Sequence, residues 1–104
     1  MARVAFNRAD GLLCAYLSGE IDHHSAQDLR ERIDSQLAVL LPDRLILDFA
    51  AVTFMDSSGL GLILGRQRRM QSAGGKLVVQ HPPQQIKKVL DLAGVAYTAA
   101  GGAV

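Results

Sequence analysis

Two serine hydroxyls and a carboxylate stand next to each other in the segment Asp56-Ser57-Ser58. An apolar run precedes this segment and residues with helical spacing follow it, so we expect the loop after a buried strand to open into a helix here. The first turn of a helix carries backbone N–H groups without internal partners and a partial positive charge, which together stabilise an anion. A phosphate on Ser57 or Ser58 can therefore be accepted without unfolding the domain.

A phosphate at this position would change what the segment can bind. It adds about 1.5 to 2 negative charges beside Asp56. A partner surface that is shaped for a neutral hydroxyl, or is itself acidic, then meets both bulk and repulsion. The segment thus favours a binding site that phosphorylation switches, although serines that only cap the helix fit the same motif equally well.

Glycines are frequent after the two serines, at Gly59, Gly61 and Gly65. Each costs about 1 kcal/mol relative to alanine in a helix interior, so a compensating gain is expected. We interpret Gly59 and Gly61 as positions where another chain lies against the helix start, and Gly65 as a position of tight packing on the sheet.

Composition and charge argue against several classes of partner. The 104-residue chain has 11 basic and 10 acidic residues, so it lacks the concentrated positive field that nucleic acid or an anionic membrane requires. The densest basic cluster, Arg66, Arg68 and Arg69, has no interleaved aromatic residues for base stacking and is interpreted as a solvated helix face.

No apolar run approaches the ~18 residues of a membrane span, and the N-terminus does not resemble a signal peptide. The lone Cys14 fits a reducing compartment and is interpreted as a small buried hydrophobic residue. We therefore expect a cytoplasmic protein that binds neither nucleic acid nor membrane.

Signals for catalysis or metal binding are weak. The segment from Asp56 to Gly59 does not match the G-x-S-x-G elbow of serine hydrolases, so a serine hydrolase is only a remote alternative. His23, His24 and His81 are the available metal-ligating imidazoles, and adjacent histidines before a helix more often hydrogen-bond locally than share a metal. We expect no catalytic residue, no metal and no cofactor.

Strand and helix signals in the first half of the chain are clear. Residues 4–7 and 12–18 read as two antiparallel strands joined by an Asp10-Gly11 turn, and the second strand is apolar on both faces, which predicts a central, fully buried position. A helix is expected from Ser25, which forms an S-x-x-D capping pattern with Asp28, to a point before Pro42. Its apolar stripe is Leu29, Ile33, Leu37 and Leu40.

The second half alternates strands and helices. We predict a buried strand at 44–49, a connection at 50–55, a helix from the serine segment to 73–75, a strand at 76–80, a helix at 84–93 and a short strand at 95–98. The second helix is marked by Leu60, Ile63, Leu64 and Met70. This alternation predicts a single α/β domain over residues 1–98, with a small mixed β-sheet and helices packed mainly on one side. Residues 99–104 are expected to be a frayed tail.

Two stretches of the sequence resemble those of a known family. They are Leu17 to Ser25, which reads L-S-G-E-I-D-H-H-S, and Phe54 to Arg66, which reads F-M-D-S-S-G-L-G-L-I-L-G-R. Both are similar to the STAS-domain anti-sigma factor antagonists, most of all to the stage II sporulation protein AA group, the antagonists of the anti-sigma F factor. The resemblance extends from the first strand to Gly94 and implies a STAS-like fold.

The resemblance also implies roles for particular residues. It makes Ser57 the phosphorylation site and places the loop around Asp22 beside it, where that loop helps to contact the kinase. Together with the local chemistry, it gives a partner-binding set of Asp22, His23, Asp56, Ser57, Ser58, Gly59 and Gly61.

The partners that the resemblance implies form a cycle. The unphosphorylated protein binds an anti-sigma factor and thereby frees a sigma factor. The anti-sigma factor is also a serine kinase that uses its own bound ATP to phosphorylate Ser57, and a serine phosphatase restores the hydroxyl. The alternative is a STAS module of a general stress-response or other partner-switching pathway. Members of the family usually continue into a C-terminal helix, whereas only ten residues, rich in glycine and alanine, follow Gly94.

Overall fold

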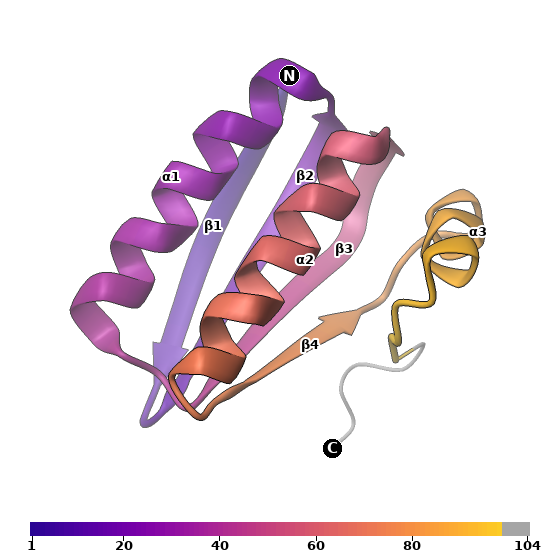
Figure 1. Cartoon of the computed structure of the whole chain (residues 1–104). Helices are drawn as coiled ribbons and strands as arrows, with labels where there is room; N and C mark the ends of the chain where they lie inside the picture. Colours follow the sequence, from indigo (N-terminus) through magenta and orange to yellow (C-terminus); the bar gives the residue numbers. More distant parts are fainter. Residues whose placement is uncertain (99–104) are drawn as a thin grey trace.

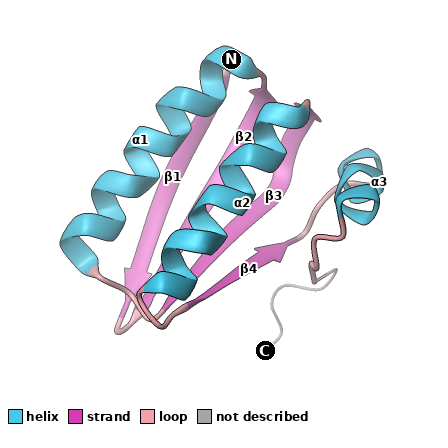
Figure 2. Cartoon of the chain, in the orientation of Figure 1, coloured by secondary structure: helices cyan, strands magenta, loops and turns pink. Residues whose placement is uncertain are grey.

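The computed structural model describes residues 1–98, which form one four-stranded sheet and three helices (Figures 1 and 2). The strands are β1 (Ala2–Ala9), β2 (Leu12–Ile21), β3 (Arg44–Met55) and β4 (Lys76–Gln80). The helices are α1 (His23–Leu40), α2 (Ser57–Ser72) and α3 (Gln84–Ala93). The strand order is β1-β2-β3-β4, with β1 antiparallel to β2 and the other neighbours parallel. The predicted α/β fold with a small mixed sheet is confirmed; the predicted frayed tail lies outside the described residues.

The helices cover mainly one face of the sheet, as expected. Figure 1 shows α1 and α2 side by side on that face, because the two parallel crossovers, β2-α1-β3 and β3-α2-β4, take the same hand. The third helix, α3, lies beside the sheet, where the Gln85 side chain donates a hydrogen bond to the Thr53 carbonyl at 2.9 Å. The core fills the space between the helices and the covered face, with fully buried residues that include Leu13, Leu17, Leu29, Ile33, Leu47, Phe49 and Ile63. Within residues 1–98, none of the helices combines the length and apolarity needed to cross a membrane.

The second strand lies in the interior of the sheet, as predicted, but it is not buried on both sides. Leu13 and Leu17 point into the core, whereas Tyr16 on the opposite face is 43% exposed, because neither α1 nor α2 covers that face. Cys14 lies on the same face as Tyr16 and is nonetheless buried, so its interpretation as a buried hydrophobic residue is confirmed. Burial raises the pKa of the Cys14 thiol, which keeps it protonated and unreactive at neutral pH.

The first strand brings the N-terminus to the end of the sheet where the parallel strands finish. This placement follows from its antiparallel pairing, in which Ala2 lies opposite Gly19. The carbonyl of Met1 accepts a hydrogen bond from the Glu20 N–H at 3.3 Å, and the terminal ammonium group lies 3.6 Å from the Glu20 carboxylate.

The sequence predictions for strands were wrong in extent everywhere except at β4. The strands β1 (Ala2–Ala9) and β2 (Leu12–Ile21) are longer than the predicted 4–7 and 12–18. Residues 50–55 belong to β3 rather than to a connection, because they pair with the second half of β2 across two register shifts, from Ala51 opposite Ser18 to Met55 opposite Ile21. Residues 95–98 do not form a strand, since only Thr98 makes an isolated bridge to Gln80. In contrast, β4 and α3 have the predicted bounds.

One member of the basic cluster is not on a solvated face. Arg66 is buried between α1 and α2, whereas Arg68 and Arg69 are exposed as expected. The stripe assigned to α2 needs a similar correction, because Ile63 and Met70 are buried but Leu64 is 40% exposed.

Candidate functional site

The starts of α1 and α2 lie side by side because β2 and β3 end together. The last residues of the two strands, Ile21 and Met55, are paired, and each strand is followed by one N-cap residue, Asp22 or Asp56. The Asp56 N–H donates a hydrogen bond to the Ile21 carbonyl at 3.2 Å, which ties the two loops together. Both stretches that carry the family resemblance therefore meet at one edge of the molecule.

The cap of α2 is Asp56, and neither serine takes that role. An Asp56 carboxylate oxygen accepts a hydrogen bond from the Ser58 N–H at 2.8 Å, and its carbonyl accepts one from the Gly59 N–H at 3.0 Å. Ser57 is the first residue of the helix and is exposed, while Ser58 is half-buried. In the described part of the chain, neither serine hydroxyl hydrogen-bonds to the protein, so helix capping does not explain the serine pair.

The exposed hydroxyl of Ser57 has the surroundings that a phosphate needs. It projects from the first turn of α2, where the helix dipole favours negative charge. Asp56 already caps the helix, so a phosphate on Ser57 need not replace any existing hydrogen bond. The added charge would lie next to Asp56 and across from Asp22, at an edge that already carries two carboxylates.

Asp22 caps α1, which begins at His23 and not at Ser25. The Ser25 N–H donates to an Asp22 carboxylate oxygen at 2.9 Å, and the Asp22 N–H donates to the Ser25 hydroxyl at 2.9 Å, a complete capping box. These hydrogen bonds from the Ser25 backbone and side chain lower the pKa of Asp22 below its ordinary value. The sequence prediction assigned the cap to Ser25 and Asp28; Ser25 instead occupies the third helical position, and Asp28 forms an ion pair with Arg32 at 2.9 Å.

Replacing Asp22 by alanine is therefore expected to destabilise the fold as well as affect partner binding. Loss of an N-cap typically removes enough stability to lower the melting temperature of a domain of this size by about 4 to 8 °C. Asp22→Asn should preserve most of the stability, because an amide oxygen also accepts the Ser25 N–H. Thermal unfolding followed by circular dichroism measures both. An unchanged melting temperature in Asp22→Ala would show that the capping box contributes little.

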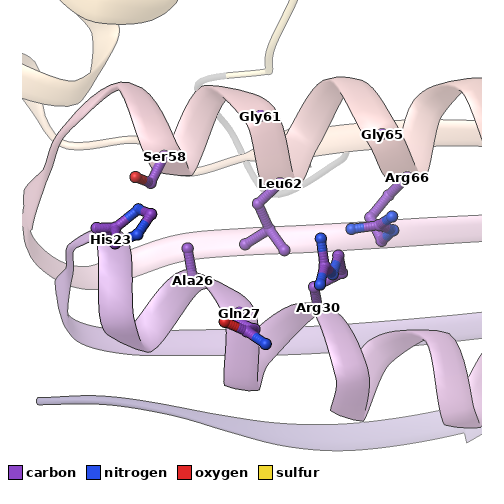
Figure 3. Close-up of a pocket in the computed structure, with 9 residues that line it drawn as sticks. All are labelled: His23, Ala26, Gln27, Arg30, Ser58, Gly61, Leu62, Gly65 and Arg66. Atoms are coloured by element: carbon purple, nitrogen blue, oxygen red, sulfur yellow. The ribbon is translucent and has the colours of Figure 1, made fainter.

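His23 lies at the first position of α1 and is exposed, with its ring directed toward the side chain of Ser58 (Figure 3). The adjacent His24 stacks edge-on against it, with ring centroids 5.7 Å apart. Within residues 1–98, no group of three or more His, Cys, Asp or Glu side chains is arranged to hold a metal ion.

The three glycines of α2 differ in what they contact. A Cβ at Gly59 would overlap the Met55 side chain and lie 3.5 Å from Ile21, so glycine is required there by packing within the chain. A Cβ at Gly61 or Gly65 would have no atom within 4 Å. Gly61 and Gly65 therefore both face open space, so the interpretation of Gly65 as tightly packed on the sheet is wrong, and the contact of a partner with Gly61 stays a prediction.

Alanine substitutions at two of these positions are expected to have opposite effects on stability. Gly65→Ala should raise the free energy of unfolding by about 1 kcal/mol, because it adds helix propensity without a clash. Gly59→Ala should lower it by about 1 kcal/mol, since the gain in propensity is outweighed by overpacking against Met55. Urea denaturation of the two variants and the wild type measures the difference; equal shifts in one direction would contradict this account.

Exposed apolar residues next to Ser57 were not identified from the sequence. Phe54 is 49% exposed at the end of β3, and Leu64 is 40% exposed two turns after Ser57 on the same side of α2. Both fit apolar runs whose neighbours are buried, so no signal in the sequence distinguished them. Contiguous exposed apolar side chains mark protein-binding surfaces, which makes Phe54 and Leu64 candidates for the border of such a surface.

The family model for the STAS domain matches residues 3–98. The chain therefore belongs to the STAS domain family. This match spans all the strands and helices described above, including both helix starts and the residues around them.

Comparison with individual relatives shows which kind of STAS-domain protein the chain resembles. The chain is 35% identical over 85 residues to an anti-sigma F factor antagonist of Paenibacillus polymyxa, a match that covers 82% of this chain and 73% of the relative. It is 33% identical over 79 residues to that of Lysinibacillus sphaericus, covering 76% and 68%. The solved structure of the unphosphorylated anti-sigma factor antagonist SpoIIAA superposes with a TM-score of 0.81 at 26% identity, covering 94% of this chain and 90% of that one. Within the STAS domain family, the chain is thus an anti-sigma factor antagonist, and the predicted resemblance is confirmed.

Membership in this class favours a regulatory role for the chain over an enzymatic one. Anti-sigma factor antagonists are regulatory proteins that act by binding an anti-sigma factor. The prediction of a regulatory binding protein is confirmed to that extent, and the remote alternative of a serine hydrolase loses its support.

Proposed function

We propose that an anti-sigma factor with serine kinase activity phosphorylates Ser57 and that this modification controls the partner switch. The unphosphorylated chain binds the anti-sigma factor in the cytoplasm and frees a sigma factor. The kinase uses ATP bound in its own active site, and a serine phosphatase later removes the phosphate. The observation that carries this proposal is the exposure of Ser57 on a helix whose cap is supplied by Asp56.

The proposed binding surface consists of the residues that surround Ser57 at the shared edge. We call it the switch surface, and it comprises Asp22, His23, Asp56, Ser57, Ser58 and Gly61, with Phe54 and Leu64 at its border. Gly59 supports this surface from below through its packing on Met55, so its own contact with a partner is not part of the proposal. The surface combines acidic, hydroxyl and apolar groups, a mixture common in transient protein interfaces.

Phosphorylation acts on this surface without changing the fold. The phosphate adds bulk and about 1.5 to 2 negative charges at a point that already faces two carboxylates. A partner that fits closely around a neutral hydroxyl is then excluded by contact and by repulsion. SpoIIAA has been solved in a phosphorylated form as well, with a TM-score of 0.75 to this chain at 26% identity, which supports a fold that tolerates the modification.

Phosphosite mapping tests the proposal directly. The chain is incubated with the anti-sigma kinase and ATP, and the product is digested and analysed by mass spectrometry. We expect a single phosphate on Ser57, full modification of Ser58→Ala and no modification of Ser57→Ala. A phosphate on Ser58 would move the switch to the neighbouring residue, and no phosphate on either would refute the mechanism.

Similarity to an anti-sigma-B factor antagonist makes a general stress pathway the second candidate for this chain. The chain is also 29% identical over 85 residues to the anti-sigma-B factor antagonist of Bacillus subtilis, which covers 76% of this chain and 71% of the relative. We propose the anti-sigma F type as the first assignment and the general stress type as its alternative. Co-precipitation with an anti-sigma F factor and an anti-sigma-B factor, each with its bound nucleotide, distinguishes them by which partner is retained.

A further inference from the structure

A groove with a volume of about 340 Å³ runs along the seam between α1 and α2 (Figure 3). It begins at Ser58 beside the switch surface and ends at Arg66. Gln27 and Arg30 line it from α1, and Gly61 and Gly65 line it from α2. A volume of this size is at the lower end of the range for small-molecule sites in proteins.

The inner end of the groove contains a buried charge that is incompletely paired. The side chain of Arg66 is 9% exposed, and its Nε lies 2.8 Å from an Asp34 carboxylate oxygen, although the N–H is not aligned for a hydrogen bond. One terminal nitrogen, Nη1, is buried and has no partner within the described residues. A buried guanidinium without its hydrogen bonds is costly, so an additional acceptor at this point would be stabilising.

Positive charge is in excess around Arg66. Asp34 also lies 3.5 Å from Arg69, so one carboxylate serves two guanidinium groups. Across the groove, Arg30 points toward Arg66 from α1, and no ion pair holds it in the part of the chain that the structure describes (Figure 3). Burial lowers the pKa of Arg66; nearby Asp34 opposes this effect, and the charges of Arg30 and Arg69 add to it.

The groove is kept open by the absence of side chains on one wall. Gly61 and Gly65 are one helical turn apart on α2, and a Cβ at either position would meet no atom within 4 Å. Neither glycine is needed for packing, and both reduce the stability of the helix. Together they leave space for a group to reach the two guanidiniums from outside.

We propose that this groove is a binding site for an oxyanion, a carboxylate or phosphate group that is held between Arg30 and Arg66. The guanidinium of Arg66 lines the groove, and its unpartnered Nη1, which is buried in the unliganded chain, reaches the anion once the side chain shifts toward it, while Arg30 can close over the anion from the opposite helix. Gln27 and Ser58 are further donors along the groove. The group belongs either to a free small molecule or to an acidic side chain of a chain lying in the groove; the recognition chemistry is the same. The site does not depend on phosphorylation of Ser57.

Titration of the ¹⁵N-labelled protein by NMR tests the proposal. The probes are inorganic phosphate, succinate, and a blocked peptide of six glutamates, each added at constant ionic strength. We expect saturable shifts of the Gly61 and Gly65 amides and of the Arg66 Nε–H. Saturation by phosphate or succinate indicates a free anion, and saturation by the peptide alone indicates an acidic chain; either result supports the site.

Matched variants separate specific binding from general charge attraction. Arg30→Gln should weaken the binding of the effective probe about tenfold, because it removes one charged donor from an exposed position that the fold does not need. Gly65→Leu should abolish binding by filling the groove. Arg68→Gln, which removes the same charge from an exposed position outside the groove, should change the affinity less than twofold. The proposal is overturned if no probe saturates, or if Arg30→Gln and Arg68→Gln weaken binding equally.

Discussion

Replacing Ser57 by aspartate is expected to weaken binding of the anti-sigma factor by more than about tenfold while leaving the fold intact. The substitution places a permanent negative charge at the first helical position, beside Asp56 and in the centre of the switch surface. A partner that fits around the neutral hydroxyl has to desolvate this charge without an opposite charge to pair with it, and a cost of about 1.4 kcal/mol already corresponds to a tenfold loss of affinity. An acidic residue in the first turn of α2 is also favourable for the helix, so stability should not fall.

The control for this experiment is Ser72→Asp, which adds the same charge at the opposite end of α2. That position is exposed and lies roughly 22 Å along the helix axis from Ser57. Isothermal titration of both variants with the anti-sigma factor gives the affinities. The proposal fails if Ser57→Asp binds like the wild type, or if both variants lose affinity to the same degree.

Replacing Asp48 by alanine is expected to destabilise the fold by about 3 kcal/mol. Asp48 is 6% exposed and alternates along β3 with the core residues Leu47 and Phe49, so its side chain lies on the face of the sheet that α1 and α2 leave open. Its carboxylate accepts hydrogen bonds from the Gln80 side chain at 2.7 Å, the His81 ring at 2.9 Å and the Ala50 N–H at 2.9 Å. His81 has a left-handed backbone conformation with φ of 56°, so the network also holds a strained residue at the end of β4.

The same network makes stability depend on pH in a defined direction. Burial raises the pKa of Asp48, but the hydrogen bonds from His81, Ala50 and Gln80 outweigh it and hold the pKa below its ordinary value. The ionised carboxylate therefore stabilises the fold above the ordinary pKa of about 3.9, and this contribution is lost as the pH falls through the lower, folded value.

Urea denaturation between pH 7 and the acid range measures this effect. The loss of stability toward low pH should be smaller in Asp48→Asn than in the wild type, because the amide does not titrate. Asp28→Asn is the matched control, since that carboxylate is exposed and forms only a surface ion pair with Arg32. Identical pH profiles for wild type and Asp48→Asn would exclude Asp48 as a source of the pH dependence.

The parts of the fold that the sequence predicted correctly are those bounded by local signals. Gly75 before β4 and the two prolines after it mark that strand, and Gly94 ends α3 in a left-handed conformation with φ of 71°. The errors arose where the outcome depends on pairing between distant segments. Two capping patterns overlap before α1, at Asp22 with Ser25 and at Ser25 with Asp28, and the first prevails because the pairing of Ile21 with Met55 fixes where the strand ends.

Part of the candidate site could also be predicted from local patterns in the sequence. A serine next to an aspartate at a helix start is a local pattern, and the exposure of Ser57 agrees with the accessibility that phosphorylation requires. The burial of Arg66 was not predictable, because its position in the helical repeat is compatible with a solvated face unless the packing of α1 against α2 is known. The groove between α1 and α2 therefore could be identified only from the structure and not from the sequence.

The antiparallel direction of β1 has a practical consequence for anyone who attaches a label to this protein. Because the Met1 carbonyl accepts a hydrogen bond from the Glu20 N–H, any tag fused ahead of Met1 starts at the same edge as Asp22 and the proposed switch surface. The hairpin turn at Asp10 and Gly11 projects from the other end of the sheet. A label attached at that turn leaves the proposed switch surface free.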